Sequence, residues 1–419
     1  MIAAVASAAR RPGAVAAVAF VLLAGAATLV WHYVRGGRLE VVDITRYRDL
    51  GERIAGGAVP YRDVDLEYPP GSIVAFALPA LVTSSRGAFF VVFSGLMAAV
   101  GLAAVLVSAR LLRVLGATPG ETRLRLALVA ATPLALGGVI LTRFDLVPVL
   151  VLLLALLALA GGRDRLGLLL LGLATATKVY PVVALPIAVM WIWRRSGRRV
   201  ALTRLAECAA VPVVAYAAFA VMSPGGVADS LWGQLSRPLQ IESLASGVLL
   251  ALHHVAGMSL TWSSGSGSQN LDGTAAAVLA GVSTVVGAAA LLLVWRSFWR
   301  GPATPRRLVR HAAGSVVAFV AFSKVLSPQY LVWLVFLVPF VLGPGSRAVL
   351  GLLAAACAAT AVWFPGLYWA LVKEFDPVAS AFVLVRDLLL VALLVVLAVT
   401  DAEREPPRSR LPVPSPGHR

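Results

Sequence analysis

Long apolar runs, separated by short charged segments, recur along almost the whole chain. Many of them reach the roughly 18 to 20 residues that a helix needs to cross a bilayer. Because lipid offers no partners for backbone polar groups, helices are the only plausible spans in such a chain. The pattern predicts about twelve transmembrane helices, at about 13–34, 88–109, 124–141, 145–161, 166–177, 180–193, 201–221, 274–297, 311–324, 329–343, 347–364 and 379–399.

Two regions depart from this pattern. The run Ser72–Val82 holds only about a dozen apolar residues, too few for a span, so we expect a short helix in the outer membrane interface. The pieces 166–177 and 180–193 are also short, and they flank Lys178. They fit either two short spans or the broken helix pair that many transporters contain.

Composition supports an all-α polytopic membrane protein. The 419 residues are 59% hydrophobic and only 13% charged, with a mean hydropathy of +0.87, whereas soluble domains are nearer half apolar and a quarter charged. We expect one transmembrane domain over residues 1–399, with an extracytoplasmic first loop at 35–87 that carries short interfacial helices. The Pro-rich, charged segment 400–419 predicts a disordered cytoplasmic tail.

The net charge of +16 is explained by topology and does not indicate nucleic-acid binding. The basic residues cluster in short loops between apolar runs, and Lys and Arg are retained on the cytoplasmic side of a membrane. This rule predicts that both chain ends are cytoplasmic. Most acidic residues then fall on the outer side, a skew that orientation alone does not require.

Neither end of the chain nor its cysteines suggests another class of protein. The first apolar run is too long for the core of a signal peptide, so we expect an uncleaved helix. Cys208 and Cys357 both lie inside apolar runs, which indicates packing rather than a disulfide framework or a metal site.

The first outer loop gathers many charges between two apolar anchors. The pattern from Asp43 to Ile54 predicts a short amphipathic helix that ends at Gly56-Gly57, and Pro69-Pro70 should begin the interfacial helix. The charges fit a plain solvated loop. They equally fit a set of carboxylates held beside the lipid headgroups, where a lipid-linked substrate would react; its polar members include Asp65, Glu67 and Tyr68.

Three other outer turns also carry ionisable residues in apolar surroundings. A charge at the centre of a span costs about 2.5–3.5 kcal/mol, so such residues are usually paired, solvated or functional. Each Lys or Arg could instead extend its side chain to the headgroups. The three turns are TRFDLVP with Arg143 and Asp145, ATKVYP with Lys178 and Tyr180, and SKVLSPQY with Lys324, Ser327, Gln329 and Tyr330.

Metal-binding and standard catalytic motifs are weak or missing. Asp63-Val64-Asp65 imitates an Asp-x-Asp motif, but two carboxylates in a charged loop are a poor basis for a metal site. His253-His254 lie in an apolar stretch, where a structural role is the simpler interpretation. The sequence has no P-loop, zinc spacing or serine-triad motif.

The polar motifs together resemble those of glycosyltransferase family 87. The matching stretches are DITRYRD, PYRDVDLEYPPG, the run from TRFDLVP through TKVYPVVALP, and FSKVLSPQYLVWL, in the order of the family. Region 222–272 and the C-terminal part carry no such signature. The resemblance implies a GT-C fold and a mannosyltransferase, of the hexosyltransferase class, that uses a polyprenyl phosphate sugar as donor.

The resemblance also implies an active site on the outer face of the plasma membrane, with Asp43 as the catalytic base. Cations are expected to bind the donor phosphate, and Arg143, Lys178 and Lys324 are the candidates, with Tyr180 beside them. Acceptor and sugar binding is assigned to Asp65, Glu67, Tyr68, Asp145, Gln329 and Tyr330. No metal or cofactor is expected, and the partners are membrane lipids, the lipid-linked sugar and a glycolipid or glycan acceptor.

Other functions remain open at this point. A transporter or flippase of lipid-linked sugars would have a similar number of spans, but it would place its charges near the midplane of the membrane. A glycan polymerase or ligase would carry its key residues in a large later loop. The acceptor, the choice between mannose and another sugar such as arabinose, and the oligomeric state are not encoded in any recognisable motif.

Overall fold

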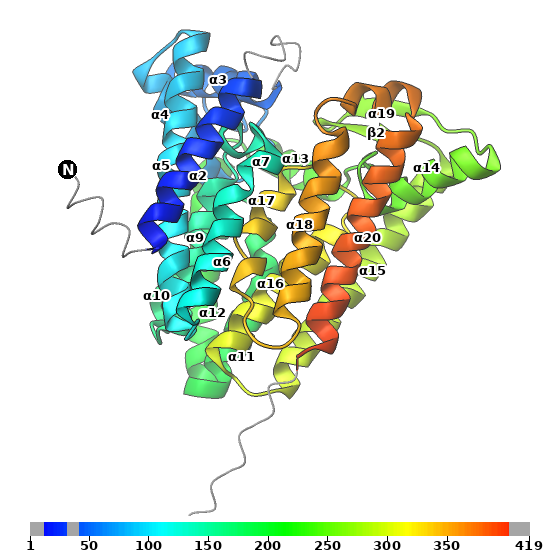
Figure 1. Ribbon diagram of the computed structural model, residues 1–419. Coiled ribbons are helices and arrows are strands. Elements are labelled where there is room, and N and C mark those ends of the chain that lie inside the picture. Colours follow the sequence, from blue (N-terminus) through cyan, green and yellow to red (C-terminus); the bar gives the residue numbers. More distant parts are fainter. Residues whose placement is uncertain (1–11, 32–41, 402–419) are drawn as a thin grey trace, which may run out of the picture.

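The computed structural model describes residues 12–31 and 42–401 of the chain. These segments form a mainly helical bundle whose long helices run between two opposite ends (Figure 1). Six described helices are long and apolar enough to cross a bilayer. They are α2 (Pro12–Leu29), α5 (Arg86–Val114), α12 (Arg198–Ala220), α15 (Thr274–Arg300), α18 (Ser346–Trp363) and α20 (Pro377–Val399).

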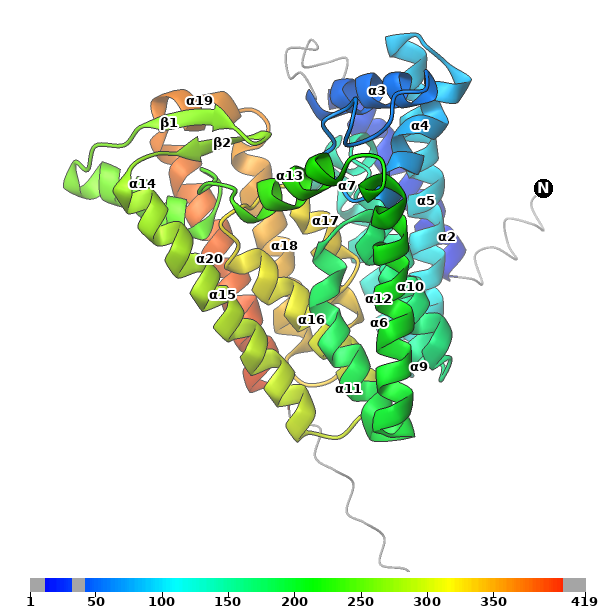
Figure 2. The same ribbon diagram turned by 180° about the vertical axis from the view of Figure 1, so that it is seen from behind.

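Shorter helices complete the bundle (Figures 1 and 2). They are α6 (Pro119–Ala131), α9 (Leu146–Ala160), α10 (Asp164–Thr177), α11 (Leu185–Ser196), α16 (Pro305–Ala321) and α17 (Tyr330–Val335). Helix α16 is buried along nearly its whole length, so it lies in the core of the bundle. The six long apolar helices support the prediction of a multi-pass membrane protein, while the number of about twelve spans stays a prediction.

The loops that carry the basic clusters lie at one end of the bundle. The junctions α9–α10, α11–α12 and α15–α16 meet there, together with the end of α20 (Figure 1). The first loop lies at the opposite end, which we call the polar end. This separation of the loops agrees with the alternation of cytoplasmic and outer loops that the charge pattern predicts. Which end faces outward stays a prediction. The predicted tail, residues 400–419, lies mostly outside the described residues.

Both short helices predicted for the first loop are present at the polar end. Helix α3 (Val42–Ala55) buries Tyr47, whose ring stacks on Phe76 with centroids 4.6 Å apart. Phe76 belongs to α4 (Ile73–Val82), which follows the 3-10 helix η2 (Pro70–Ser72). Pro70 opens η2 because a proline at the first helical position loses no hydrogen bond. Whether α4 lies in the membrane interface stays a prediction.

Region 222–272, which lacks any sequence signature, also folds at the polar end. It forms α13 (Pro224–Leu235), α14 (Leu244–Ala256) and an antiparallel hairpin of β1 (Trp262–Gly265) and β2 (Ser268–Leu271). The expectation of an all-α protein is thus wrong at this hairpin. Its turn residues Ser266 and Gly267 both have positive φ, +52° and +68°, which is typical of a type I′ turn.

Helix α13 fastens the first loop to the rest of the polar end. Ser230 Oγ donates to the carbonyl oxygen of Leu66 at 2.7 Å, and Gln234 Nε2 donates to that of Glu67 at 2.8 Å. Gly226 lies so close to the carbonyl oxygen of Tyr61 that a Cβ would collide with it. These contacts join segments about 160 residues apart.

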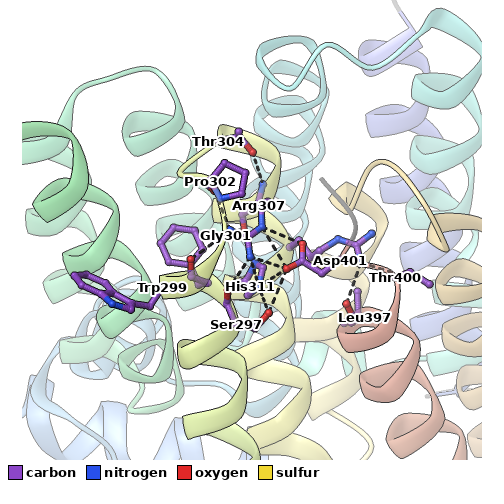
Figure 3. A network of polar contacts seen from close by, with 12 residues as sticks. Ser297, Trp299, Gly301, Pro302, Thr304, Arg307, His311, Leu397, Thr400 and Asp401 are labelled. Atoms are coloured by element: carbon purple, nitrogen blue, oxygen red, sulfur yellow. Dashed lines mark hydrogen bonds and ion pairs between the residues drawn. The ribbon is translucent and has the colours of Figure 1, made fainter. Parts of the chain in front are cut away.

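The opposite end is held by a buried ionic network (Figure 3). Arg307 of α16 pairs with Asp401 at 2.6 Å, and His311 Nε2 lies 3.2 Å from the same carboxylate. The nitrogen that pairs with Asp401, Nη2, also donates to the carbonyl oxygen of Ser297, and Nη1 donates to that of Pro302. The guanidinium therefore links α15, α16 and Asp401, the second residue beyond the end of α20.

We expect Gly226→Ala to destabilise the protein by about 1–3 kcal/mol, because a backbone oxygen cannot move aside as a side chain can. The measurement is the thermal unfolding midpoint of the purified protein in detergent. The matched control is Gly225→Ala in the same turn of α13, where a Cβ would meet nothing within 4 Å. Equal midpoints for the two variants would contradict this packing of α13 on the first loop.

Candidate active site

A cavity of about 590 Å³ opens at the polar end between the first loop, the bundle and region 222–272. Its volume is in the range of small-molecule sites in proteins. Most of the residues singled out from the sequence line it. They are Asp43, Glu67, Tyr68, Arg143, Lys178, Tyr180, Gln329 and Tyr330.

The first ion pair of the cavity joins Asp43 to Arg143. Asp43 lies in the first turn of α3. Arg143 follows the short helix α8 (Val139–Thr142), where the chain turns extended before α9 begins. The side chains are 27% and 16% exposed, so both can be reached from the cavity.

A second ion pair lies deeper. Lys178 Nζ is 2.7 Å from Asp145 Oδ1, and the same oxygen accepts a hydrogen bond of 2.5 Å from Trp333 Nε1. Asp145 is only 1% exposed and does not line the cavity, whereas Lys178 does. Asp145 therefore acts on the cavity through Lys178.

Aromatic rings form one wall beside this pair. Trp333 of α17 stacks between Tyr180 and Tyr330, with centroid distances of 3.8 and 4.1 Å. Lys178 Nζ lies 4.6 Å from the centroid of the Phe144 ring. A flat aromatic wall with hydroxyl groups suits the apolar faces and hydroxyls of a sugar ring.

A third ion pair closes the cavity toward the hairpin. Arg46 of α3 pairs with Glu67 at 3.2 Å. The hairpin turn reaches this pair, since a Cβ on Gly267 would come within 3.3 Å of both Arg46 and Glu67. The first loop and the hairpin, about 200 residues apart in the chain, thus share one wall.

Three predicted site residues are not brought into the lining: Asp145, which lies behind Lys178, Asp65 and Lys324. Asp65 is exposed to solvent outside the cavity. Lys324 also lies outside the lining, where its Nζ donates to the carbonyl oxygen of Leu235 at 2.8 Å.

The residues that resembled weak metal ligands, Asp63 and His253, instead form contacts within the protein. Asp63 Oδ2 accepts a hydrogen bond from the backbone N–H of Val59, and the carboxylate pairs with Arg62. Hydrogen bonds from Arg62 and Val59 lower the pKa of the Asp63 carboxyl to about 2. His253 Nδ1 lies 2.6 Å from the carbonyl oxygen of Met258, beyond the end of α14. Over residues 12–31 and 42–401, no group of three potential metal ligands occurs.

Sequence reasoning missed several residues of the lining. Gln240 and Glu242 lie between α13 and α14, and Tyr368 begins α19 (Tyr368–Glu374). Arg46 and Arg237 are missed as well. In the sequence these are single polar residues outside any recognised motif. Arg237, Gln240 and Glu242 also lie in a region where polar loop residues are common.

Glu242 is a buried carboxyl at the cavity wall. Its Oε2 accepts a 2.5 Å hydrogen bond from Gln240 Nε2, and its Oε1 has no hydrogen-bond partner within the described part of the chain. Arg386 of α20 donates to the backbone oxygen of Glu242 but pairs its charge with Asp387 at 2.8 Å. Burial raises the pKa of Glu242 to about 7, with the guanidinium of Arg386 opposing the shift.

Comparison with known proteins identifies one family. The sequence model of glycosyltransferase family 87 matches residues 66–328. No curated protein matches the chain. Among solved structures, ArnT from Cupriavidus metallidurans bound to undecaprenyl phosphate is similar at 14% identity and a TM-score of 0.44, over 85% of this chain and 73% of that one. A likeness of that degree supports no conclusion about activity.

The raised pKa of Glu242 predicts a pH-dependent loss of stability. The folded chain keeps a proton that the unfolded chain releases from about pH 4.5, so stability falls as the pH rises from there to about 7. Glu242→Gln cannot ionise, so its unfolding midpoint should rise relative to wild type across this window. The measurement is thermal unfolding in detergent from pH 5 to 8, with Glu374→Gln, at an exposed position of α19, as control. A constant difference between Glu242→Gln and wild type would refute the assignment.

Proposed function

The chain belongs to glycosyltransferase family 87, and from this premise we propose that it transfers a mannosyl residue from a polyprenyl phosphate donor to a glycolipid or glycan acceptor. The chain is thus a membrane glycosyltransferase; the sugar, the lipid donor and the acceptor are the proposal. The observation that carries it is the convergence of Asp43, Arg143 and Lys178, from three distant segments, on one cavity at the polar end. Asp43 itself precedes the matched range, so its role depends on this geometry.

In the proposed reaction the acceptor hydroxyl oxygen attacks C1 of the donor sugar and its proton passes to the Asp43 carboxylate. The bond between C1 and the phosphate oxygen breaks, and its electron pair stays on the phosphate. This leaving group needs no proton, so one base suffices. Arg143 orients the Asp43 carboxylate, and fixed cationic groups in a partly dry cavity stabilise charge that develops during the reaction.

The remaining side chains suit the binding of a sugar. Tyr68, Gln329 and Tyr330 offer hydrogen-bonding groups to the cavity, and Glu67 adds a carboxylate opposite them. Tyr180 contributes its ring, stacked on Trp333, and its hydroxyl has no partner within the described residues. Asp145, which is buried outside the lining, holds Lys178 in place through their ion pair. Asp65, which lies outside the lining, has no part in the proposal.

A transporter or flippase would need its charged groups near the middle of the membrane. Here the three ion pairs of the cavity all gather at the polar end of the bundle, beside the loops. That placement favours chemistry at a membrane surface. We propose that this surface is the outer face of the plasma membrane, in keeping with basic loops at the opposite end.

Asp43→Asn should lower mannosyl transfer by a factor of about 10² to 10⁴, because the amide cannot accept the proton. The assay is incorporation of labelled mannose from purified polyprenyl phosphate mannose into membrane lipids by the reconstituted protein. Asp49→Asn is the matched control, since Asp49 is on the same helix but exposed. Full activity of Asp43→Asn would remove Asp43 as the base, and no transfer by wild type from this donor would refute the proposed donor.

A further inference from the structure

The charges of the cavity can be accounted for one by one. Four cationic side chains line it within the described residues. Three of them are neutralised by a carboxylate: Arg46 by Glu67, Arg143 by Asp43, and Lys178 by Asp145. The fourth, Arg237, forms no ion pair with any described carboxylate.

Arg237 is held in place by neutral groups. It follows α13, and one terminal nitrogen donates to the carbonyl oxygen of Ser266 at 2.6 Å and to Ser268 Oγ at 3.2 Å. Its Nε is buried and has no hydrogen-bond partner in the described part of the structure. The hairpin turn thus fixes the position of the guanidinium without cancelling its charge.

Lys324 adds a second positive charge close to Arg237. Its Nζ donates to the carbonyl oxygen of Leu235, two residues before Arg237. Burial, and then the charge of Arg237, lower the pKa of Lys324, so the two cations lie near enough to repel each other. Neither forms an ion pair elsewhere among the described residues. Two like charges held together without an anion are characteristic of an anion-binding site.

The nearby carboxylate does not cancel this charge. Glu242 is the remaining acidic residue of the lining, and it forms no ion pair within the described part of the chain. Its Oε2 is hydrogen-bonded to Gln240, and no nitrogen of Arg237 lies within ion-pair distance of it. No carboxylate of residues 12–31 or 42–401 therefore pairs with the charge of Arg237 at the cavity.

We propose that Arg237, assisted by Lys324, binds the phosphate of the donor and stabilises it as leaving group. This inference rests on the proposed function. The donor phosphate is a diester with one negative charge, and when its bond to C1 breaks it keeps the electron pair and becomes a monoester with a second charge. A guanidinium that is not already paired gains most from that increase, and its planar donors match phosphate oxygens.

This assignment separates two tasks among the cations. Arg143 and Lys178 keep their carboxylates in place, while Arg237 binds the phosphate and Lys324, outside the lining, adds positive charge beside it. It also gives a role to region 222–272, since the hairpin turn supplies the oxygens that orient Arg237.

The test is equilibrium binding of farnesyl phosphate and of farnesol, its uncharged counterpart, to the purified full-length protein in detergent. Arg237→Gln should weaken farnesyl phosphate binding at least about tenfold, as expected for the loss of a charged hydrogen bond, and leave farnesol binding unchanged. Arg237→Lys should keep part of the affinity. Ser268→Ala removes one hydroxyl that accepts from Arg237 but no charge, so it serves as the control for the hairpin.

Each result decides between the claims. Unchanged farnesyl phosphate affinity in Arg237→Gln, with wild type binding the phosphate more tightly than farnesol, overturns the role of Arg237 and leaves the proposed function standing. An equal loss for both ligands, or the same loss in Ser268→Ala, shows that Arg237 only supports the hairpin and also overturns it. If wild type binds farnesyl phosphate no better than farnesol, the phosphate donor itself is refuted.

Discussion

The ion pair of Asp43 with Arg143 is the contact on which the polar end depends. It joins the first turn of α3 to the break between α8 and α9, and so fixes the first loop against the bundle. Removing one partner of a partly buried pair leaves the other charge without compensation, which costs more than the pair itself contributes. The same contact sets the place of the proposed base, because a carboxylate held by a guanidinium cannot turn away from the cavity. The same interaction therefore serves both the packing of the first loop and the proposed chemistry.

Much of this arrangement could be predicted from the sequence, for a physical reason. A charged residue in an apolar run must be paired or solvated, so Arg143, Asp145 and Lys178 are conspicuous in the sequence. In the structure each of them is paired, Arg143 with Asp43 and Lys178 with Asp145. The amphipathic period of α3 and the prolines before α4 were equally clear. Arg237, Gln240 and Glu242 could not be recognised, because polar residues in loops are ordinary and their meaning comes only from contacts with residues far away in the chain. The hairpin turn was missed for the same reason, although its Gly-Ser-Gly-Ser composition suits a tight turn.

The network around Arg307 and the cavity at the polar end use buried polar groups differently. Around Arg307 and Asp401 the guanidinium nitrogens are matched by a carboxylate and backbone oxygens, and only a small space of about 10 Å³ remains beside them. At the polar end, Tyr180 Oη, Asp145 Oδ2 and Glu242 Oε1 are buried and lack hydrogen-bond partners within the described residues. Buried polar atoms are nearly always satisfied in proteins. A set of unsatisfied atoms around a cavity of about 590 Å³ is what a site for a polar ligand requires.

Net charge decides what such a site can hold. If every cation were paired, the cavity would be neutral and would bind a sugar without a preference for phosphate. If none were paired, the mutual repulsion of four cations in a confined space would oppose folding. Among the described residues, Arg46, Arg143 and Lys178 are paired and Arg237 is not, and burial raises the pKa of Glu242 to about 7. Below that pH the cavity therefore keeps an excess positive charge, which suits one phosphate. In the proposed reaction the lipid phosphate gains charge as it departs, so the excess cation serves the transition state more than the bound donor, which is the condition for faster transfer rather than mere binding.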